Sequence, residues 1–145
     1  MQARLINEVI LIYICTKKIT YMGVNCYCGS GNAYSNCCEP YIKGIKKAPT
    51  AEALMRSRYS AYAVLAADYL WKTTAPQERK HHSKAAILEW AKSNQWIKLE
   101  VLNATETTVE FKAYYLDNLL QAQVHHEYST FVKEGGSWYY AYGEY

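Results

Sequence analysis

Four cysteines fall within thirteen residues, and they are the side chains of this sequence best suited to chemistry. Cys26 and Cys28 form one close pair, Cys37 and Cys38 form the other, and the eight residues between the pairs include a Gly-Ser-Gly run. Structural zinc takes four soft ligands in a tetrahedron, and two close cysteine pairs joined by a turn supply that geometry. Glycine permits the positive φ angles that such a turn needs. The pattern therefore predicts one structural Zn²⁺ bound by these four cysteines.

Disulfide bonding is the main alternative use of the cluster. A bond between the adjacent Cys37 and Cys38 would be strained, and clustered cysteines in a chain without a convincing export signal indicate a metal instead. Redox catalysis favours a C-x-x-C spacing, which the sequence lacks. The Gly-Ser-Gly run has neither the GK[ST] ending nor the preceding strand of a phosphate-binding loop. Zinc is the preferred interpretation.

Histidines near the C-terminal end are the next candidates for chemistry. Alternation along residues 120–132 places His126 and Tyr128 on one strand face, and His125 and Glu127 on the other. If the first face lines an internal pocket, His126 points into it as a general base or polar anchor. A buried histidine that is hydrogen-bonded to a tyrosine fits the same pattern. His125 and Glu127 fit either a dyad or a surface pair.

Two arginines lie among apolar residues of a predicted helix. Arg56 or Arg58 would either pair with a carboxylate and tie the helix to the sheet, or reach the pocket and hold an anionic ligand. No Ser-His-Asp order, carboxylate pair or dinucleotide fingerprint stands out in the sequence, so enzymatic activity is left open. The predicted pocket residues are Arg56, Arg58, Tyr59, Tyr62, His126 and Tyr128.

Three helices followed by four strands would position these side chains. Helical spacing and capping residues predict helices over 51–66, 68–73 and 78–93. From Trp96 the hydrophobic period changes to two, which predicts strands over 96–101, 109–115, 120–132 and 137–142. A Gly-Gly pair suits a tight turn between the last two. The expected fold is α+β: a small four-cysteine zinc element, then a cone-like domain of three helices packed on a bent antiparallel four-stranded sheet.

The composition limits the classes of protein that fit. Half of the residues are hydrophobic and a fifth are charged, as in ordinary globular proteins. A net charge of +3 is far from the strongly basic signature of a dedicated nucleic-acid binder, so nucleic acid is only weakly supported as a partner. The apolar run over 9–15 is too short to span a bilayer and lacks a small-residue cleavage site. We expect a cytoplasmic protein without a membrane segment.

The sequence patterns divide the chain into three parts. Residues 1–21 bring no pattern that the rest needs and end just before a second methionine, Met22. We expect them to be an upstream extension that is dispensable for folding; a short strand or helix that packs loosely on the domain is the alternative. Residues 22–45 form the zinc element, and residues 46–145 form the α+β domain.

Several segments together resemble known families. Residues 26–38 with the following Glu-Pro-Tyr are similar to the SEC-C motif, the zinc-binding element at the C-terminus of the SecA translocase. Residues 48–62, 125–131 and 136–140 resemble the YchJ-like family of uncharacterised bacterial proteins. The resemblance covers residues 24–143. It implies a middle domain similar to the cone-shaped fold of nuclear transport factor two, and a start just ahead of the first cysteine.

Two functions follow from these patterns. The first is a binding or adaptor protein that contacts a protein partner through its zinc element, as the resemblance to the SecA tail implies. An aromatic and basic surface would serve that contact, formed by Tyr27, Tyr34, Tyr41, Lys43, Lys46 and Lys47. The second is a small-molecule binder or an enzyme of the isomerase or hydrolase type, which would use the pocket of the cone. An open pocket with convergent polar groups favours the second function, and a pocket filled by aromatic rings favours the first.

Overall fold

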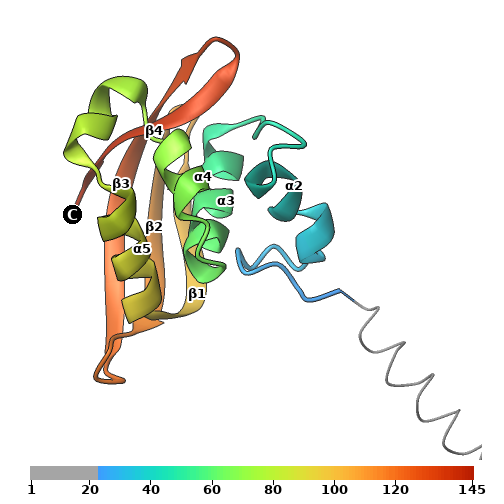
Figure 1. Cartoon of the computed structure of the whole chain (residues 1–145). Coiled ribbons are helices and arrows are strands. Elements are labelled where there is room, and N and C mark those ends of the chain that lie inside the picture. The colour runs from blue at the N-terminus through green and yellow to red at the C-terminus, as the bar shows by residue number, and fades with distance from the viewer. Residues whose placement is uncertain (1–22) are drawn as a thin grey trace, which may run out of the picture.

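The chain builds three helices on one face of a four-stranded antiparallel sheet (Figure 1), which confirms the predicted α+β architecture. The computed structural model describes residues 23–145, so the predictions for residues 1–21 lie outside the described part. The elements are η1 (Tyr34–Asn36), α2 (Glu39–Ile42), α3 (Ala51–Ala63), α4 (Ala67–Lys72), η2 (Pro76–His81), α5 (Lys84–Ser93), β1 (Gln95–Ala104), β2 (Thr108–Leu116), β3 (Ala122–Glu134) and β4 (Ser137–Glu144).

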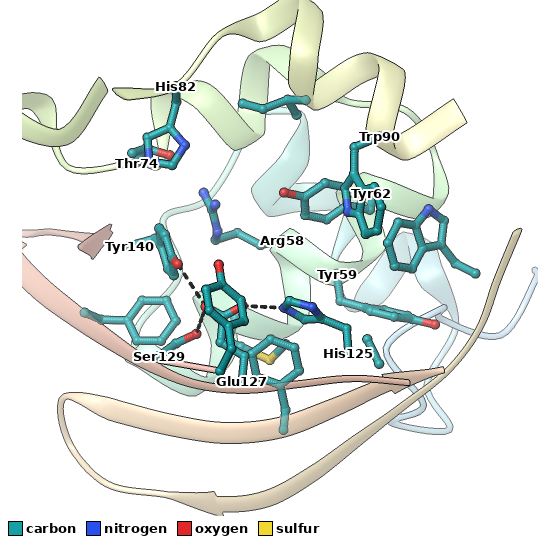
Figure 2. Close-up of a pocket in the computed structure, with 17 residues that line it drawn as sticks. Arg58, Tyr59, Tyr62, Thr74, His82, Trp90, His125, Glu127, Ser129 and Tyr140 are labelled. Carbon is teal, nitrogen blue, oxygen red and sulfur yellow. Dashed lines mark hydrogen bonds and ion pairs between the residues drawn. The ribbon is translucent and has the colours of Figure 1, made fainter. Parts of the chain in front are cut away.

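The sheet is an antiparallel meander whose spatial order follows the chain, β1-β2-β3-β4. Register shifts interrupt the β1–β2 pairing twice and the β3–β4 pairing once, between Thr130 and Phe131. Such bulges bend strands and increase their twist. Gly135 and Gly136 both have positive φ, as a two-residue turn between β3 and β4 requires. The resulting curvature gives the sheet a concave face toward the helices (Figure 2).

Two of the predicted helices end or divide differently from the expectation. The first ends at Ala63 because Leu65 adopts a left-handed φ of 62°, and the Ala66 N–H bonds to the Ala61 carbonyl as in a Schellman C-cap. The third expected helix, over 78–93, divides into η2 and α5. Ser83 starts α5 as a new helix by accepting a hydrogen bond from the Ala86 N–H.

Helix α3 packs against two partners at once. Thr50 caps it by accepting the Ala53 N–H at 3.0 Å. Leu54 and Tyr59 are buried in a core that continues into the cysteine element and the sheet. Three of the four cysteines, Cys26, Cys28 and Cys38, belong to the same core. In Figure 1 the cysteine element with α2 lies on one side of α3, and the sheet lies on the other. The cysteine element is therefore packed onto the α+β domain.

Within residues 23–145, no helix combines the length and the apolar character needed to cross a bilayer.

The shared core predicts that shortening a buried side chain of α3 strongly destabilises the protein. We expect Leu54→Ala to lower the free energy of unfolding by about 2–5 kcal/mol, because the side chain is only 2% exposed and its loss leaves a cavity. Chemical denaturation followed by tryptophan fluorescence measures the change. The matched control is Leu119→Ala at a position that is 72% exposed, where we expect a change below about 0.5 kcal/mol. Equal stability of the two variants would contradict the placement of α3 at the centre of the core.

Candidate functional site

The four cysteine sulfurs form a ligand set with the right dimensions for one metal ion. All four Sγ atoms lie within 4.8 Å of one another, with Cys28 and Cys37 at 3.6 Å and Cys37 and Cys38 at 3.9 Å. A tetrahedral four-thiolate site with metal–sulfur bonds of about 2.3 Å requires sulfur–sulfur separations of about 3.8 Å. The four residues therefore fit a tetrahedral metal ion.

Neighbouring groups hold the cysteines in this arrangement. Ser30 Oγ lies 3.3 Å from Cys37 Sγ, and the buried Ser60 Oγ of α3 lies 3.7 Å from Cys26 Sγ. Arg56 donates from Nη1 to the Cys28 carbonyl at 2.9 Å. These contacts resemble the outer-shell hydrogen bonds that orient metal ligands.

The thiols also share their protons unequally. A hydrogen bond from Cys38 lowers the pKa of Cys28 to about 4, and the same bond together with burial raises the pKa of Cys38. A lowered pKa favours the thiolate form of Cys28, and the thiolate is the form that binds metal.

A second site lies inside the α+β domain, as a cavity of about 310 Å³ between the concave face of the sheet and the helices (Figure 2). Its walls combine aromatic rings with polar groups. Tyr59, Tyr62, Trp90 and Trp96 supply flat rings from α3, α5 and β1. The polar groups that line the cavity are Arg58, Thr74, His82, His125, Glu127, Ser129 and Tyr140. An open cavity with convergent polar groups is typical of a small-molecule site.

Glu127 is the buried charge at the floor of the cavity. Its carboxylate accepts hydrogen bonds from three side chains, which Figure 2 shows as dashed lines. His125 Nε2 lies 2.7 Å from Oε2, and Oε1 accepts from Ser129 Oγ at 2.8 Å and from Tyr140 Oη at 2.9 Å. Gly143 on β4 leaves room for the group, because a Cβ there would overlap the carboxylate. A buried carboxylate needs partners of this kind to remain charged.

The hydrogen bonds decide the protonation state of Glu127. Burial alone would raise the pKa of the carboxyl group, but hydrogen bonds from His125, Ser129 and Tyr140 outweigh burial, and the pKa lies below its usual value. Burial and the nearby Glu127 charge raise the pKa of Tyr140, so its hydroxyl stays protonated and donates a hydrogen bond to the carboxylate. Glu127 is thus an ionised acceptor at neutral pH.

Arg58 is the cation of the cavity. Its Nη1 donates to the Leu70 carbonyl at 2.8 Å and to Thr73 Oγ1 at 2.7 Å, and its guanidinium lies 4.7 Å from the centre of the Tyr140 ring. Among residues 23–145, Nε and Nη2 of Arg58 have no hydrogen-bond partner, and no carboxylate pairs with the guanidinium. Figure 2 shows the side chain extending between Tyr140 and Tyr62. Arg58 can therefore bind an anion that enters the cavity.

The predicted pocket residues divide into two groups. Arg58, Tyr59 and Tyr62 line the cavity. The placement of His126 and Tyr128 in the pocket is wrong, because both lie on the outer face of β3, where His126 bonds to Glu110 and Tyr128 to Thr108.

Arg56 also lies outside the cavity. Its Nη1 donates to the Cys28 carbonyl of the cysteine element, and its Nη2 lies 3.7 Å from Glu52 Oε1.

The error in β3 concerns which face is inward. The face with Val124, His126 and Tyr128 is the more apolar near its start, and local hydrophobicity therefore favours it as the inward face. The observed register pairs His125 with Ala113 and Glu127 with Phe111, and these residues of β2 are buried. The inward face tolerates His125 and Glu127 because the two bond to each other. Knowing the β2–β3 register would have identified them, since β2 alternates clearly, but one sequence does not supply that register.

Sequence reasoning also missed two groups at the rim of the cavity. His82 lines it from the link between η2 and α5, within a charged and polar stretch of the sequence. Tyr145 places its ring 5.1 Å from the His125 ring. Neither has a local signal, because only the packing of distant segments brings it to the cavity.

Comparisons with known proteins agree with this architecture. The family described as YchJ, middle NTF2-like domain, matches residues 50–143. A UPF0225 protein from Geobacter sulfurreducens is 41% identical over 125 residues, which cover 81% of this chain and 77% of that protein. The solution structure of a SEC-C motif containing protein from Rhodopseudomonas palustris is similar, with a TM-score of 0.77, 39% identity, and coverage of 83% of this chain and 98% of that chain. A crystal structure of a SEC-C motif containing protein from Psychrobacter arcticus has a TM-score of 0.71, with 35% identity and coverage of 83% and 81%.

The position of Glu127 predicts that residue 143 must remain glycine. We expect Gly143→Ala to lower the free energy of unfolding by about 1–3 kcal/mol, because the added methyl group displaces the hydrogen-bonded carboxylate. The control is Gly23→Ala, where the added Cβ meets only ordinary contacts at 3.7 and 3.8 Å. Thermal and urea unfolding measure both variants. A neutral effect of Gly143→Ala would place the Glu127 side chain elsewhere.

Proposed function

This chain belongs to the YchJ-like family, which includes the UPF0225 proteins, and from that premise we propose that it is a zinc-stabilised protein that binds a small organic anion in its α+β cavity. The observation that carries the proposal is Arg58, whose guanidinium faces an open cavity without a carboxylate partner in residues 23–145. A permanently charged group held by backbone and hydroxyl acceptors is suited to recognise a carboxylate or phosphate. The cavity volume of about 310 Å³ suits a small molecule.

Fixed geometry supports the role of Arg58. Two hydrogen bonds and the Tyr140 ring hold the guanidinium, so little side-chain entropy is lost when an anion binds. Aromatic rings line the cavity, and a lower local dielectric beside them strengthens the attraction between the guanidinium and an anion. The aromatic walls add a preference for a ligand with a flat apolar part.

The cysteine site supports zinc as the metal. Four thiolates in a tetrahedral set are a frequent ligand combination of structural zinc, and all four positions are protein ligands, so none is left for a substrate. Three of the cysteines belong to the core that α3 shares with the sheet. We assign the ion a structural role: it fixes the surface against which one side of α3 packs. A reducing cytoplasm keeps such thiols free for metal, and it is the compartment we propose.

A second function, the binding of a protein partner through the zinc element, rests on one exposed aromatic residue. The Tyr27 side chain lies between two zinc ligands, is 41% exposed, and contacts Tyr34 edge-on at 5.3 Å. Lys43 lies on the same element, Lys46 and Lys47 follow directly after it, and all three lysines are exposed. An aromatic anchor beside positive charge suits an acidic protein surface.

The metal assignment predicts one tightly bound Zn²⁺ per chain. Elemental analysis of protein purified without added metal should give about one equivalent, and Cys28→Ser should abolish it. Because the cysteines share the core with α3, removal of zinc by a strong chelator should lower the thermal midpoint of the whole domain in a single transition. Asn36→Ser, an exposed position between the ligand pairs, is the control that should retain the metal. A metal-free protein with an unchanged midpoint would contradict a structural ion.

The anion site predicts binding of an aromatic carboxylate that depends on Arg58. We expect benzoate to shift amide NMR signals of cavity residues, and its uncharged isostere benzamide to bind more weakly. Arg58→Met should weaken benzoate binding at least tenfold, because charge-assisted hydrogen bonds contribute about 1.5–3 kcal/mol. Arg79→Met is the matched control, since Arg79 lies over Trp71 outside the cavity. Equal benzoate affinity in Arg58→Met and wild-type protein would exclude the proposed anion site.

A further inference from the structure

Glu127 fixes the position of the proton on His125. An ionised carboxylate only accepts hydrogen bonds, so the His125 nitrogen at 2.7 Å from Oε2 must be the donor. That nitrogen is Nε2, and the other oxygen of Glu127 is taken by Ser129 and Tyr140. A neutral His125 therefore carries its proton on Nε2 and its lone pair on Nδ1.

The lone pair of His125 is available to a molecule in the cavity. Within the described part of the chain, Nδ1 has no hydrogen-bond partner, and the His125 side chain is 31% exposed although Glu127 beside it is only 8% exposed. Figure 2 shows the ring at the floor of the cavity, with Arg58 and Tyr62 above it. The geometry is that of a base oriented by a carboxylate on its far side.

Among the described titratable groups that face His125, no other group is a base oriented by a carboxylate. The charged groups are Glu127 and, from α3, Arg58. Burial raises the pKa of Tyr62 and of Tyr140, so both keep their protons, and Tyr145 packs its ring on the imidazole. His82 at the rim is a second imidazole, but no carboxylate of residues 23–145 bonds to its ring.

We infer that His125 Nδ1 is a general base that removes a proton from carbon, in a small flat carbonyl compound that carries a carboxylate. The carboxylate part of this assignment rests on the proposed anion site at Arg58; the base does not. The C–H bond breaks, the proton moves to Nδ1, and the electron pair moves into the adjacent carbonyl group to give an enolate. When a C=C bond adjoins the carbon that loses its proton, the enolate is a dienolate. The imidazolium returns the proton to the far carbon of that bond and the C=C bond shifts, so the reaction is an isomerisation that needs no oxidant or second substrate.

Glu127 is a positioning residue in this scheme. Its negative charge stabilises the imidazolium that forms when Nδ1 takes the proton, and its bond to Nε2 holds the ring in place. A role in hydrolysis through a serine nucleophile fits less well. The Ser129 hydroxyl donates to Glu127 and therefore lies on the Nε2 side of the histidine.

A neutral carbon acid tests the base separately from the anion site. The probe is 5-nitrobenzisoxazole: a base removes its C3 proton, the ring N–O bond breaks, and the electron pair ends on the oxygen of a coloured cyanonitrophenolate. The full chain with its metal should accelerate this reaction, and His125→Gln should reduce the rate about 100-fold or more, the scale of general-base catalysis. His126→Gln is the matched control, since the neighbouring histidine lies on the outer face, and it should keep the wild-type rate.

The Glu127→Gln variant separates positioning from simple loss of structure. A neutral amide does not stabilise the imidazolium, so kcat should fall about tenfold while KM for the benzisoxazole stays unchanged. An unchanged rate in His125→Gln would overturn the assignment. If His82→Gln then lost the rate, His82 would be the base instead. Hydrolysis of 4-nitrophenyl acetate that depends on His125, with no reaction of the benzisoxazole, would also overturn proton removal from carbon.

A measurement on the wild-type protein covers the case in which the variants fail to fold. Nitrogen NMR of the histidine rings distinguishes the two neutral tautomers, and His125 should carry its proton on Nε2. A proton on Nδ1 would remove the free base and overturn the inference. Since the benzisoxazole is uncharged, its reaction tests the base without the anion site. Wild-type protein that accelerates this reaction but does not bind benzoate would keep the base and lose only the anion site, so the two failures give different results.

Discussion

The packing of α3 between the cysteine cluster and the concave sheet is the constraint on which the rest of the structure depends. Leu54 and Tyr59 of this helix are buried in one core with Cys26 and Cys28. The same helix directs Arg58 into the cavity. A helix fixed on both sides has little freedom to rotate, because packed interiors transmit small displacements. The cysteine element is therefore part of what positions the cavity, although its sulfurs lie outside it.

Inside the cavity, the dominant constraint is the cost of a buried carboxylate. An unpaired Glu127 would be strongly destabilising, and three donors from β3 and β4 remove that cost. Each donor loses freedom in turn, since the Ser129 and Tyr140 hydroxyls must point to the carboxylate and His125 must present Nε2. One buried charge thus orders the polar side of the cavity and leaves Nδ1 of His125 open.

The two sites require different things of the protein. The cysteine cluster offers four thiolates to one metal ion, and a structural metal in such a closed site provides rigidity. In the cavity, Arg58 and His125 keep hydrogen-bonding atoms that no described residue occupies, within walls of aromatic rings. Rigid supports with a few free polar groups are the usual arrangement of a small-molecule site. We see the first site as a support for the second through α3.

The sequence by itself determined the features that depend on neighbours along the chain. The cysteine spacing predicted the metal site because all four ligands come from one short segment, and helix caps and period-two alternation predicted the element types. The tertiary structure alone decided the floor of the cavity. Alternation divides β3 into two faces but does not say which is buried, and that choice depended on pairing with β2, where Phe111 lies opposite Glu127. The polar face turned inward because His125, Ser129 and Tyr140 satisfy Glu127, a compensation between strands that local hydrophobicity does not reveal.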